Sequence, residues 1–326
     1  MNVYIRSIGS YVPPRRVSND ELAQTLDTSD EWIRSHTGIR YRHIADDHIA
    51  SSDLGVEAAR QVLDASGTSP EEIDLIIVGS ASPDYPGFPS TACIIQDRLG
   101  AMNAGAMDLL AACTSFIYGL ETAKNFIVAG SARTVLVIGA ETLSRITNWN
   151  DRDSVLFGDG SGAALVVPNE DNETSNIIDS FLRAEGAGAK HLIRKAGGSR
   201  STFHINTAEE DLYLKMNGRQ VYTFAVRVLC DTIKILCERN GVGHDDIKYV
   251  VPHQANTRII EAAAKRMGMP YEKFYVNIEE YANTSAASIP LALTEMIEKD
   301  LLKRGDLILT IGFGGGLTYG GNLIRW

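Results

Sequence analysis

Three side chains of different chemistry, Cys113, His253 and Asn283, each stand where an apolar segment of this sequence ends or a helical stretch begins. A cysteine thiolate attacks carbonyl carbon and forms a covalent acyl intermediate, while imidazole and amide N–H groups stabilise negative charge on oxygen. Loss of carbon dioxide from a malonyl thioester places such charge on the thioester oxygen. Two neutral donors would hold it, whereas a carboxylate at position 283 would repel it. The three residue types therefore suit acyl transfer followed by a reaction through an enolate.

Cys113 follows the apolar residues 109–112 and precedes a stretch with helical spacing over 114–129. The first backbone N–H groups of a helix are unpaired and partly positive, so they favour a thiolate. We expect them to lower the pKa of Cys113 below the value of about 8.5 for a free thiol. The same groups would hold the oxygen of an attacked thioester. The alternative is a buried small hydrophobe, a description that fits Cys93.

His253 stands between an apolar, strand-like run at 248–251 and a helical stretch at 256–267. Sites in α/β proteins form at the carboxyl ends of such strands. Asn283 precedes a further helical stretch at 286–302. A structural histidine and a helix-capping asparagine are the alternatives.

The glycine-rich segment 312–316 follows the last long apolar run. No helical stretch comes after it and the G-x-G-x-x-G spacing is absent, so it does not predict a nucleotide site. We expect its backbone to approach a reacting centre closely and to supply an N–H donor there. A plain tight turn is the alternative.

Apolar runs bounded by turn residues alternate with amphipathic stretches along the chain, which predicts an α/β fold with parallel sheets covered by helices. The predicted strands are 74–79, 134–139, 162–167, 248–251, 306–311 and 320–324. The predicted helices are 52–66, 91–99, 114–129, 221–239, 256–267 and 286–302.

The two halves of the chain resemble each other. Residues 72–78 match 246–252 at an offset of 174 (246 − 72), and 134–139 match 306–311 at an offset of 172 (306 − 134). Added to Cys113, these offsets give positions 285–287, within the loop that Asn283 begins. An internal duplication is therefore favoured over chance similarity. The acidic connector 169–174 predicts the border, with one half over 1–170 and the other over 171–326.

Composition narrows the class of protein further. The chain has 326 residues and a formal net charge of −10, which argues against a nucleic-acid binder. Its four cysteines form no CxxC pair and no zinc-ligand spacing, a pattern that suits a reducing compartment. The sequence begins with neither a signal peptide nor a membrane-spanning segment, so we expect no membrane insertion and a cytoplasmic location.

Seven ordered segments across nearly the whole chain resemble one family, the β-ketoacyl-acyl-carrier-protein synthase III enzymes, which have the thiolase fold and start type II fatty acid synthesis. The segments are TSDEWI (28–33), TGIR (37–40), AAC (111–113), FGDG (157–160), VPHQAN (251–256), NTS (283–285) and GFGGG (312–316). The resemblance implies a duplicated, five-layer αβαβα fold, a homodimer, and a catalytic triad of Cys113, His253 and Asn283. It also implies an oxyanion hole formed by the backbone N–H groups of Cys113 and Gly315.

Binding residues follow from the same resemblance. It implies coenzyme A contacts at Trp32, Arg152 and Asn256, with the adenine between Trp32 and Arg152. The acyl pocket is expected to contain Leu143 and Phe157 of one subunit and Phe88 of its neighbour. The family needs no cofactor, because the coenzyme A thioester is a substrate.

The second substrate of the family is malonyl-acyl carrier protein, and the carrier protein is strongly acidic. Arg258, Lys265 and Arg266 follow His253 on one predicted helix and are expected to form its basic landing face. An ordinary solvated helix face is the alternative.

The sequence departs from the family at two places. His36 stands where an arginine often contacts the coenzyme A phosphates, which predicts weaker or pH-dependent contact. Thr114 and Ser115 replace a small residue and a glycine after the cysteine, which is expected to alter the pocket near the thioester.

Related enzymes differ from this chain in their catalytic residues. A degradative thiolase would carry a second cysteine near the glycine loop, and elongating synthases use two histidines. A hydroxymethylglutaryl-CoA synthase would need a glutamate near Cys113, for which Glu72 and Glu141 are poor candidates. An acyltransferase of a specialised pathway and a cysteine thioester hydrolase are the alternatives that stay open. The residue types do not separate acetyl, branched and longer primers.

Overall fold

The computed structural model describes residues 1–170, 174–203 and 207–326. A first sheet has the strand order β1-β7-β6-β4-β5. Its central strands β4 and β6 pair in parallel, and β7 runs antiparallel to β6 and β1. The strands are β1 (Val3–Tyr11), β4 (Leu75–Gly79), β5 (Gly105–Leu109), β6 (Val135–Glu141) and β7 (Gly160–Pro168).

A second sheet has the order β11-β12-β13-β8 and repeats the same pattern. Strand β11 pairs in parallel with β12, and β13 runs antiparallel to β12 and β8. The strands are β8 (Asn176–Ala184), β11 (Tyr249–Pro252), β12 (Leu307–Gly314) and β13 (Thr318–Arg325). In each sheet the central strands are fully buried, which explains their continuous apolar sequence.

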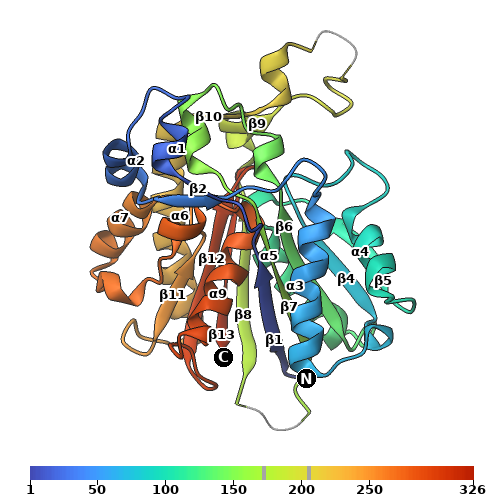
Figure 1. The fold of residues 1–326 in the computed structure, drawn as a ribbon. Coiled ribbons are helices and arrows are strands. Elements are labelled where there is room, and N and C mark those ends of the chain that lie inside the picture. Colours follow the sequence, from blue (N-terminus) through green and yellow to red (C-terminus); the bar gives the residue numbers. More distant parts are fainter. Residues whose placement is uncertain (171–173, 204–206) are drawn as a thin grey trace.

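Helices form three layers around the two sheets, as Figure 1 shows. Helices α5 and α9 lie between the sheets and contact both. Helices α3 and α4 cover the outer face of the first sheet, while α6 covers the second sheet and packs against α7. The helices are α3 (Ser51–Ser66), α4 (Thr91–Leu99), α5 (Ser115–Val128), α6 (Gly218–Asn240), α7 (Thr257–Met267) and α9 (Ser288–Glu298). The predicted αβαβα arrangement is thus confirmed.

The duplication extends to backbone detail. Strands β4, β6, β7 and β1 correspond in order and direction to β11, β12, β13 and β8. Before each central helix one residue other than glycine has a left-handed conformation, Ala112 at φ +46° and Ser285 at φ +47°. Their separation of 173 residues (285 − 112) agrees with the offsets in the sequence. We propose that the border between the halves lies in the connector 169–174, of which 171–173 fall outside the described residues.

Smaller elements close the end of the molecule where the sheets present the carboxyl ends of their parallel strands (Figure 1). They comprise β2 (Arg16–Ser18) paired with β3 (Tyr41–His43), β9 (Leu192–Arg194) paired with β10 (Leu214–Met216), and the helices α1 (Asn19–Leu22), α2 (Asp30–Thr37) and α8 (Ile278–Tyr281). Within the described residues no helix has the length and apolarity that crossing a membrane requires.

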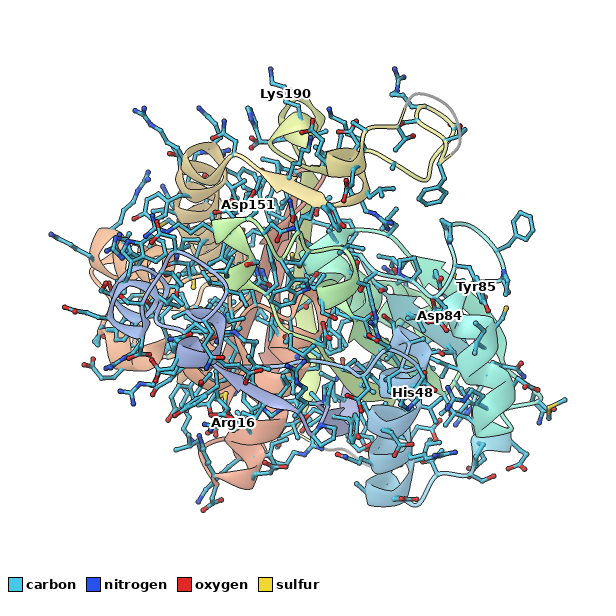
Figure 2. All side chains as sticks on the ribbon, turned by 45° about the horizontal axis from the view of Figure 1, so that its top comes forward. Arg16, His48, Asp84, Tyr85, Asp151 and Lys190 are labelled. Atoms are coloured by element: carbon cyan, nitrogen blue, oxygen red, sulfur yellow. The ribbon has the colours of Figure 1, made fainter. Side chains whose placement is uncertain are left out.

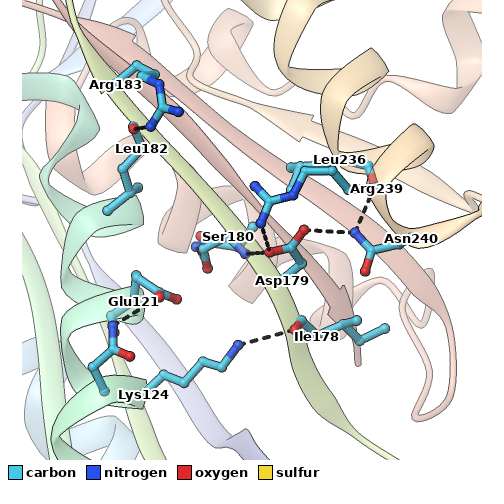
Figure 3. A network of polar contacts seen from close by, with 12 residues as sticks. Glu121, Lys124, Ile178, Asp179, Ser180, Leu182, Arg183, Leu236, Arg239 and Asn240 are labelled. Carbon is cyan, nitrogen blue, oxygen red and sulfur yellow. Dashed lines mark hydrogen bonds and ion pairs between the residues drawn. The ribbon is translucent and has the colours of Figure 1, made fainter.

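The edge strand β8 is held to α6 by a polar network that Figure 3 shows. The Asp179 carboxylate accepts hydrogen bonds from Arg239 at 3.0 Å and from Asn240 at 2.9 Å. On the side of α5, Lys124 donates to the carbonyl oxygen of Ile178 at 3.2 Å. Both helix layers are therefore anchored to the same strand.

Candidate active site

Cys113, His253 and Asn283 line one cavity of about 570 Å³. Cys113 lies in a short helical turn, Ala112–Thr114, between β5 and α5. His253 directly follows β11, and Asn283 lies in the equivalent loop before α9. The two central loops and the end of one parallel strand thus bring the three side chains together from separate parts of the chain.

The Cys113 side chain is partly buried and packs against the glycine loop. A methyl group added at Gly314 would lie 2.7 Å from Cys113 Cβ and 3.0 Å from its Sγ, so only glycine leaves room there. The loop connects β12 to β13, and no helix follows it. The segment therefore forms a tight turn and also brings its backbone close to the thiol. The sequence had suggested these two features as alternatives, and the structure has both.

The pKa of Cys113 is raised to about 11, chiefly because burial disfavours the thiolate, with a smaller contribution from the Glu141 carboxylate. The Ser285 hydroxyl and the backbone N–H groups of Cys113 and Gly315 act in the opposite direction. The prediction of a lowered thiol pKa is wrong for the free protein. Helix α5 begins only at Ser115, and the favourable N–H groups do not outweigh the loss of water around sulfur. The resting thiol is protonated at neutral pH.

His253 is buried and neutral. Burial lowers its pKa to about 3. Its backbone N–H donates to the Ile311 carbonyl at 2.7 Å, and its Nδ1 lies 2.7 Å from Ser288 Oγ. A hydroxyl either donates or accepts, so Ser288 supports both tautomers of the ring while fixing its orientation. Ser288 was not predicted from the sequence, although it lies five residues after Asn283, as the first residue of α9.

The amide of Asn283 has a defined orientation. Its Oδ1 accepts a hydrogen bond from the Ser285 backbone N–H at 2.9 Å, and its own backbone N–H donates to the Leu156 carbonyl at 2.9 Å. The Nδ2 group has no acceptor among the described residues, so both of its protons are available to the cavity. Asn283 precedes α9 by several residues and does not cap it, which sets aside the alternative of a capping role.

Glu141 is fully buried behind the cysteine loop at the end of β6. Its carboxylate accepts from Ser82 Oγ at 2.5 Å, from the Ala81 backbone N–H at 3.0 Å and from the Ala286 N–H at 3.4 Å. Burial raises its pKa, and these hydrogen bonds act against that shift. Glu141 therefore joins the loop after β4 to the loop of Asn283. Its oxygens are occupied, which fits its rejection as the glutamate of a hydroxymethylglutaryl-CoA synthase.

Trp32 and Arg152 contact each other outside the residues that line the cavity. The Arg152 guanidinium carbon lies 3.6 Å from the centre of the Trp32 ring, and His36 stacks on Trp32 with the ring centres 4.3 Å apart. Asn256 caps α7 through a 2.9 Å hydrogen bond from the Arg258 N–H. The Asn256 Nδ2 also donates to the His36 carbonyl at 3.0 Å. The residues expected to bind coenzyme A thus form one connected group beside the cavity.

Leu143 and Phe157 lie in one hydrophobic cluster with Ile146 and line the cavity. Phe88 does not, because its side chain is 91% exposed. It belongs to the loop that carries Asp84 and Tyr85, which Figure 2 shows extending from the side of the molecule. Within a single chain, two of the three residues expected in the acyl pocket are together.

Arg258, Lys265 and Arg266 are all exposed on α7, where they project away from the buried face of the helix. The Arg258 guanidinium donates to the Ser35 carbonyl at 2.9 Å and so joins α7 to α2. No ion pair with a carboxylate involves any of the three within the described residues. Their positive charge is available at the surface.

The two residues after Cys113 do not line the cavity. The Thr114 hydroxyl donates to the Thr318 carbonyl at 3.2 Å, and Ser115 Oγ accepts from the Ala111 N–H at 2.9 Å. Ser115 packs where Gly79 leaves space for it, since a methyl group at Gly79 would lie 2.3 Å from Ser115 Cβ. The two hydroxyls therefore stabilise the turn that presents Cys113, and they do not narrow the pocket.

Comparisons with known proteins agree with this geometry. Two family models match the chain, "3-Oxoacyl-[acyl-carrier-protein (ACP)] synthase III" over residues 107–186 and its C-terminal counterpart over 237–326. The chain is 49% identical over 325 residues to a β-ketoacyl-[acyl-carrier-protein] synthase III of Caldanaerobacter subterraneus, covering 99% of this chain and 97% of that protein. Another of that name from Clostridium acetobutylicum is 47% identical, covering 100% of this chain and 99% of the relative.

Solved structures point to the same family. The crystal structure of 3-oxoacyl-[acyl-carrier-protein] synthase III from Aquifex aeolicus superimposes with a TM-score of 0.91 at 43% identity, covering 99% of this chain and 100% of the other. The Thermus thermophilus synthase III superimposes with a TM-score of 0.92 at 42% identity, covering 99% of both chains. With family models, full-length relatives and fold in agreement, the chain belongs to the β-ketoacyl-acyl-carrier-protein synthase III family of condensing enzymes.

Proposed function

We propose that this protein condenses an acyl-CoA primer with malonyl-acyl carrier protein to give 3-ketoacyl-acyl carrier protein, the first carbon–carbon bond of fatty acid synthesis. One observation carries the proposal. A single cavity contains a thiol, a neutral imidazole and an amide whose Nδ2 is turned toward the open space. A thioester hydrolase needs a base that activates water, a role that the lowered pKa of His253 disfavours, whereas an enolate oxygen is stabilised by two neutral donors.

In the first half-reaction the sulfur of Cys113 bonds to the acyl carbon and the carbon–sulfur bond to coenzyme A breaks. The thiol proton leaves Cys113 and the departing coenzyme A sulfur takes it up. The backbone N–H groups of Cys113 and Gly315, which already favour negative charge at this position, stabilise the oxygen of the tetrahedral intermediate. Because the thiol is protonated at rest, this step depends on the small fraction of thiolate.

In the second half-reaction malonyl-acyl carrier protein occupies the same cavity. Its carboxylate leaves as carbon dioxide, and the electron pair moves onto the thioester oxygen. His253, in the tautomer with Nε2–H, and Asn283 Nδ2 donate hydrogen bonds to that oxygen. The enolate carbon then bonds to the acyl carbon, and the Cys113 sulfur leaves as a thiolate that takes up a proton from the solvent. Both donors stay neutral, so neither quenches the carbanion.

The same proposal assigns the remaining sites. Trp32, Arg152 and Asn256 bind coenzyme A, with the ring and the guanidinium separating to admit adenine. Arg258, Lys265 and Arg266 receive the acidic carrier protein. Phe88 enters the acyl pocket of a second copy in a homodimer. The four cysteines are all free, which supports a cytoplasmic location.

The test is the intact mass of the protein after incubation with acetyl-CoA, isobutyryl-CoA or octanoyl-CoA, followed by malonyl-acyl carrier protein. We expect an acyl adduct that Cys113→Ser abolishes and that the malonyl partner discharges into a 3-ketoacyl product. An adduct that passes only to water or to another acceptor would refute condensation. The three adducts also rank the primers.

Asn283→Ala separates the two half-reactions. We expect acylation of Cys113 to proceed nearly as in the wild type, because the N–H groups that favour negative charge there belong to the backbone of Cys113 and Gly315 and not to Asn283. Condensation should fall about a hundredfold or more, the usual effect of losing one such donor. Single-turnover acylation and condensation rates measured on the same preparation provide the comparison. Normal condensation by this variant would show that Asn283 is not a donor to the enolate.

A further inference from the structure

The cavity around Cys113 is lined mainly by apolar side chains, yet one arginine, Arg194, belongs to its wall. Arg194 ends strand β9 and is partly buried. Its Nε donates to the Leu212 carbonyl at 2.8 Å. No carboxylate among the described residues lies within ion-pair distance of it, and its two terminal nitrogens have no acceptor there. The wall therefore contains a positive charge without a counter-ion.

The acidic side chains near Arg194 already have other partners. Arg194 and Ile146 separate the main cavity from a second one of about 310 Å³, which Asp47, Asp84 and Arg145 also line. Asp47 pairs with Arg145 at 2.9 Å. Asp84 accepts hydrogen bonds from the Ser52 N–H and hydroxyl at 2.9 and 2.6 Å. Neither carboxylate neutralises Arg194, and its remaining donors are free for a ligand.

The position of Arg194 relative to the reacting sulfur follows from strand β9. Leu192, at the start of the strand, lies beside the oxyanion-hole residue, with its carbonyl oxygen 3.7 Å from a methyl group built on Gly315. Leu192 and Arg194 are two residues apart, so they share a face and are separated by about 7 Å. Arg194 pairs with Leu214, which packs on the cluster of Leu143. Arg194 therefore borders the cavity that contains Cys113, beside the cluster of Leu143, and lies about 7 Å along the strand from the residue next to Gly315.

Burial of a guanidinium without an anion is unfavourable, and burial lowers the pKa of Arg194 without removing its charge at neutral pH. A ligand that supplied a carboxylate would restore a charge-assisted, bidentate hydrogen bond. A purely hydrocarbon primer would leave the guanidinium unpaired. The cavity is thus better matched to an acyl chain with an anionic end than to one with a methyl end.

We infer that Arg194 selects acyl-CoA primers whose chain ends in a carboxylate, the monothioesters of short dicarboxylic acids with about four to six carbons. The inference rests on the proposed function, since it concerns the acyl group that Cys113 accepts. The terminal carboxylate pairs with the two free nitrogens of Arg194, while the methylene groups pack on Leu143 and Ile146. The product of condensation would then be an ω-carboxy-3-ketoacyl chain on the carrier protein.

Two primers of equal shape test the inference. Glutaryl-CoA ends in a carboxylate, and 5-methylhexanoyl-CoA has a branched alkyl group of the same outline. Acylation of Cys113 is followed by intact mass as a function of primer concentration. We expect the wild type to accept glutaryl-CoA at least as efficiently as 5-methylhexanoyl-CoA. In Arg194→Met the efficiency with glutaryl-CoA should fall about ten- to a hundredfold, with that for 5-methylhexanoyl-CoA kept or raised. Arg194→Lys should be intermediate.

A matched control is Lys195→Met, which removes the neighbouring cation that pairs with Asp211 at 3.2 Å and should leave both primers unchanged. An equal loss with both primers in Arg194→Met, or refusal of glutaryl-CoA by a wild type that accepts the alkyl primer, would overturn the inference. Failure of malonyl-acyl carrier protein to discharge any adduct would instead overturn the proposed function. Thermal unfolding of each variant separates a loss of selectivity from a loss of folding.

Discussion

At the scale of the residue, the protonation state of Cys113 predicts how the rate of its alkylation depends on pH. Its pKa of about 11 means that the thiolate fraction, and with it the rate of alkylation, rises about tenfold per pH unit between about pH 6 and 9. The measurement is the rate of iodoacetamide labelling of a Cys93→Ser variant, which lacks the exposed thiol of Cys93. A plateau near pH 7 would show that the thiol is activated in the free protein.

His253 makes a prediction about stability. Its folded pKa of about 3 lies below the unfolded value of about 6.5, so only the unfolded chain gains a proton as pH falls through that window. The contribution of the neutral His253 ring to the stability of the folded protein is fully present above pH 6.5 and diminishes toward pH 3. Through this group, acidification from pH 7 to pH 5 should lower the free energy of unfolding by about 2 kcal/mol.

The comparison for this prediction is urea unfolding of the wild type, His253→Asn and His48→Asn at the two pH values. His48 is exposed and serves as the matched control. The loss of stability on acidification should be smaller in His253→Asn and unchanged in His48→Asn. Equal pH dependence in all three proteins would mean that His253 is not buried in its neutral form.

The residues proposed to react were recognisable from the sequence because their types and their places at the ends of apolar segments are local properties. The roles of Ser288, Glu141 and Arg194 were not recognisable from the sequence. Their roles depend on which loops the fold brings together, such as Arg194 opposite Leu214 in a short strand pair. The sign of the Cys113 pKa shift failed for the same reason, since the depth of burial is set by the glycine loop from the far end of the chain.

At the scale of the element, the β12–β13 turn controls access to the thiol. A methyl group in Gly314→Ala would overlap Cys113, so the sulfur or the turn must shift, and acylation should fall about a hundredfold. Gly186→Ala is the control, because nothing lies within 4 Å of the added methyl group. Acyl adduct formation by intact mass measures both. Wild-type acylation by Gly314→Ala would mean that the turn yields without cost to the site.

The predicted strands and helices all have counterparts close to their expected bounds. Strands buried on both faces have continuous apolar sequences, and helices that cover a sheet have an apolar side at helical spacing. Strands β5 and β8 of the two large sheets were not predicted, and neither were the short strands β2, β3, β9 and β10. β5 contains Gly105 and Asp108 and is partly exposed at the edge of its sheet, and β8 has only two buried residues, Ile177 and Phe181. Edge strands have weak sequence patterns, since their partners supply only one side of their hydrogen bonds.

At the scale of the whole molecule, the β5 edge of the first sheet has no further partner strand within the described residues. Strand β5 pairs only with β4, and Phe88, Leu110 and Tyr85 expose 91%, 81% and 53% of their surface. An open edge strand with apolar neighbours favours pairing with a second copy. Light scattering after size exclusion should give twice the chain mass of 35.5 kDa. A monomer at micromolar concentration would refute the proposed homodimer.

The paired left-handed residues, Ala112 and Ser285, have an evolutionary consequence. Such backbone costs about 1–3 kcal/mol at a residue other than glycine, yet only the loop of Ala112 presents a nucleophile. A duplicated half-length unit explains the second turn, because both copies would keep the same backbone. The cysteine stands in one half and the histidine and asparagine in the other, so neither half alone contains all three residues.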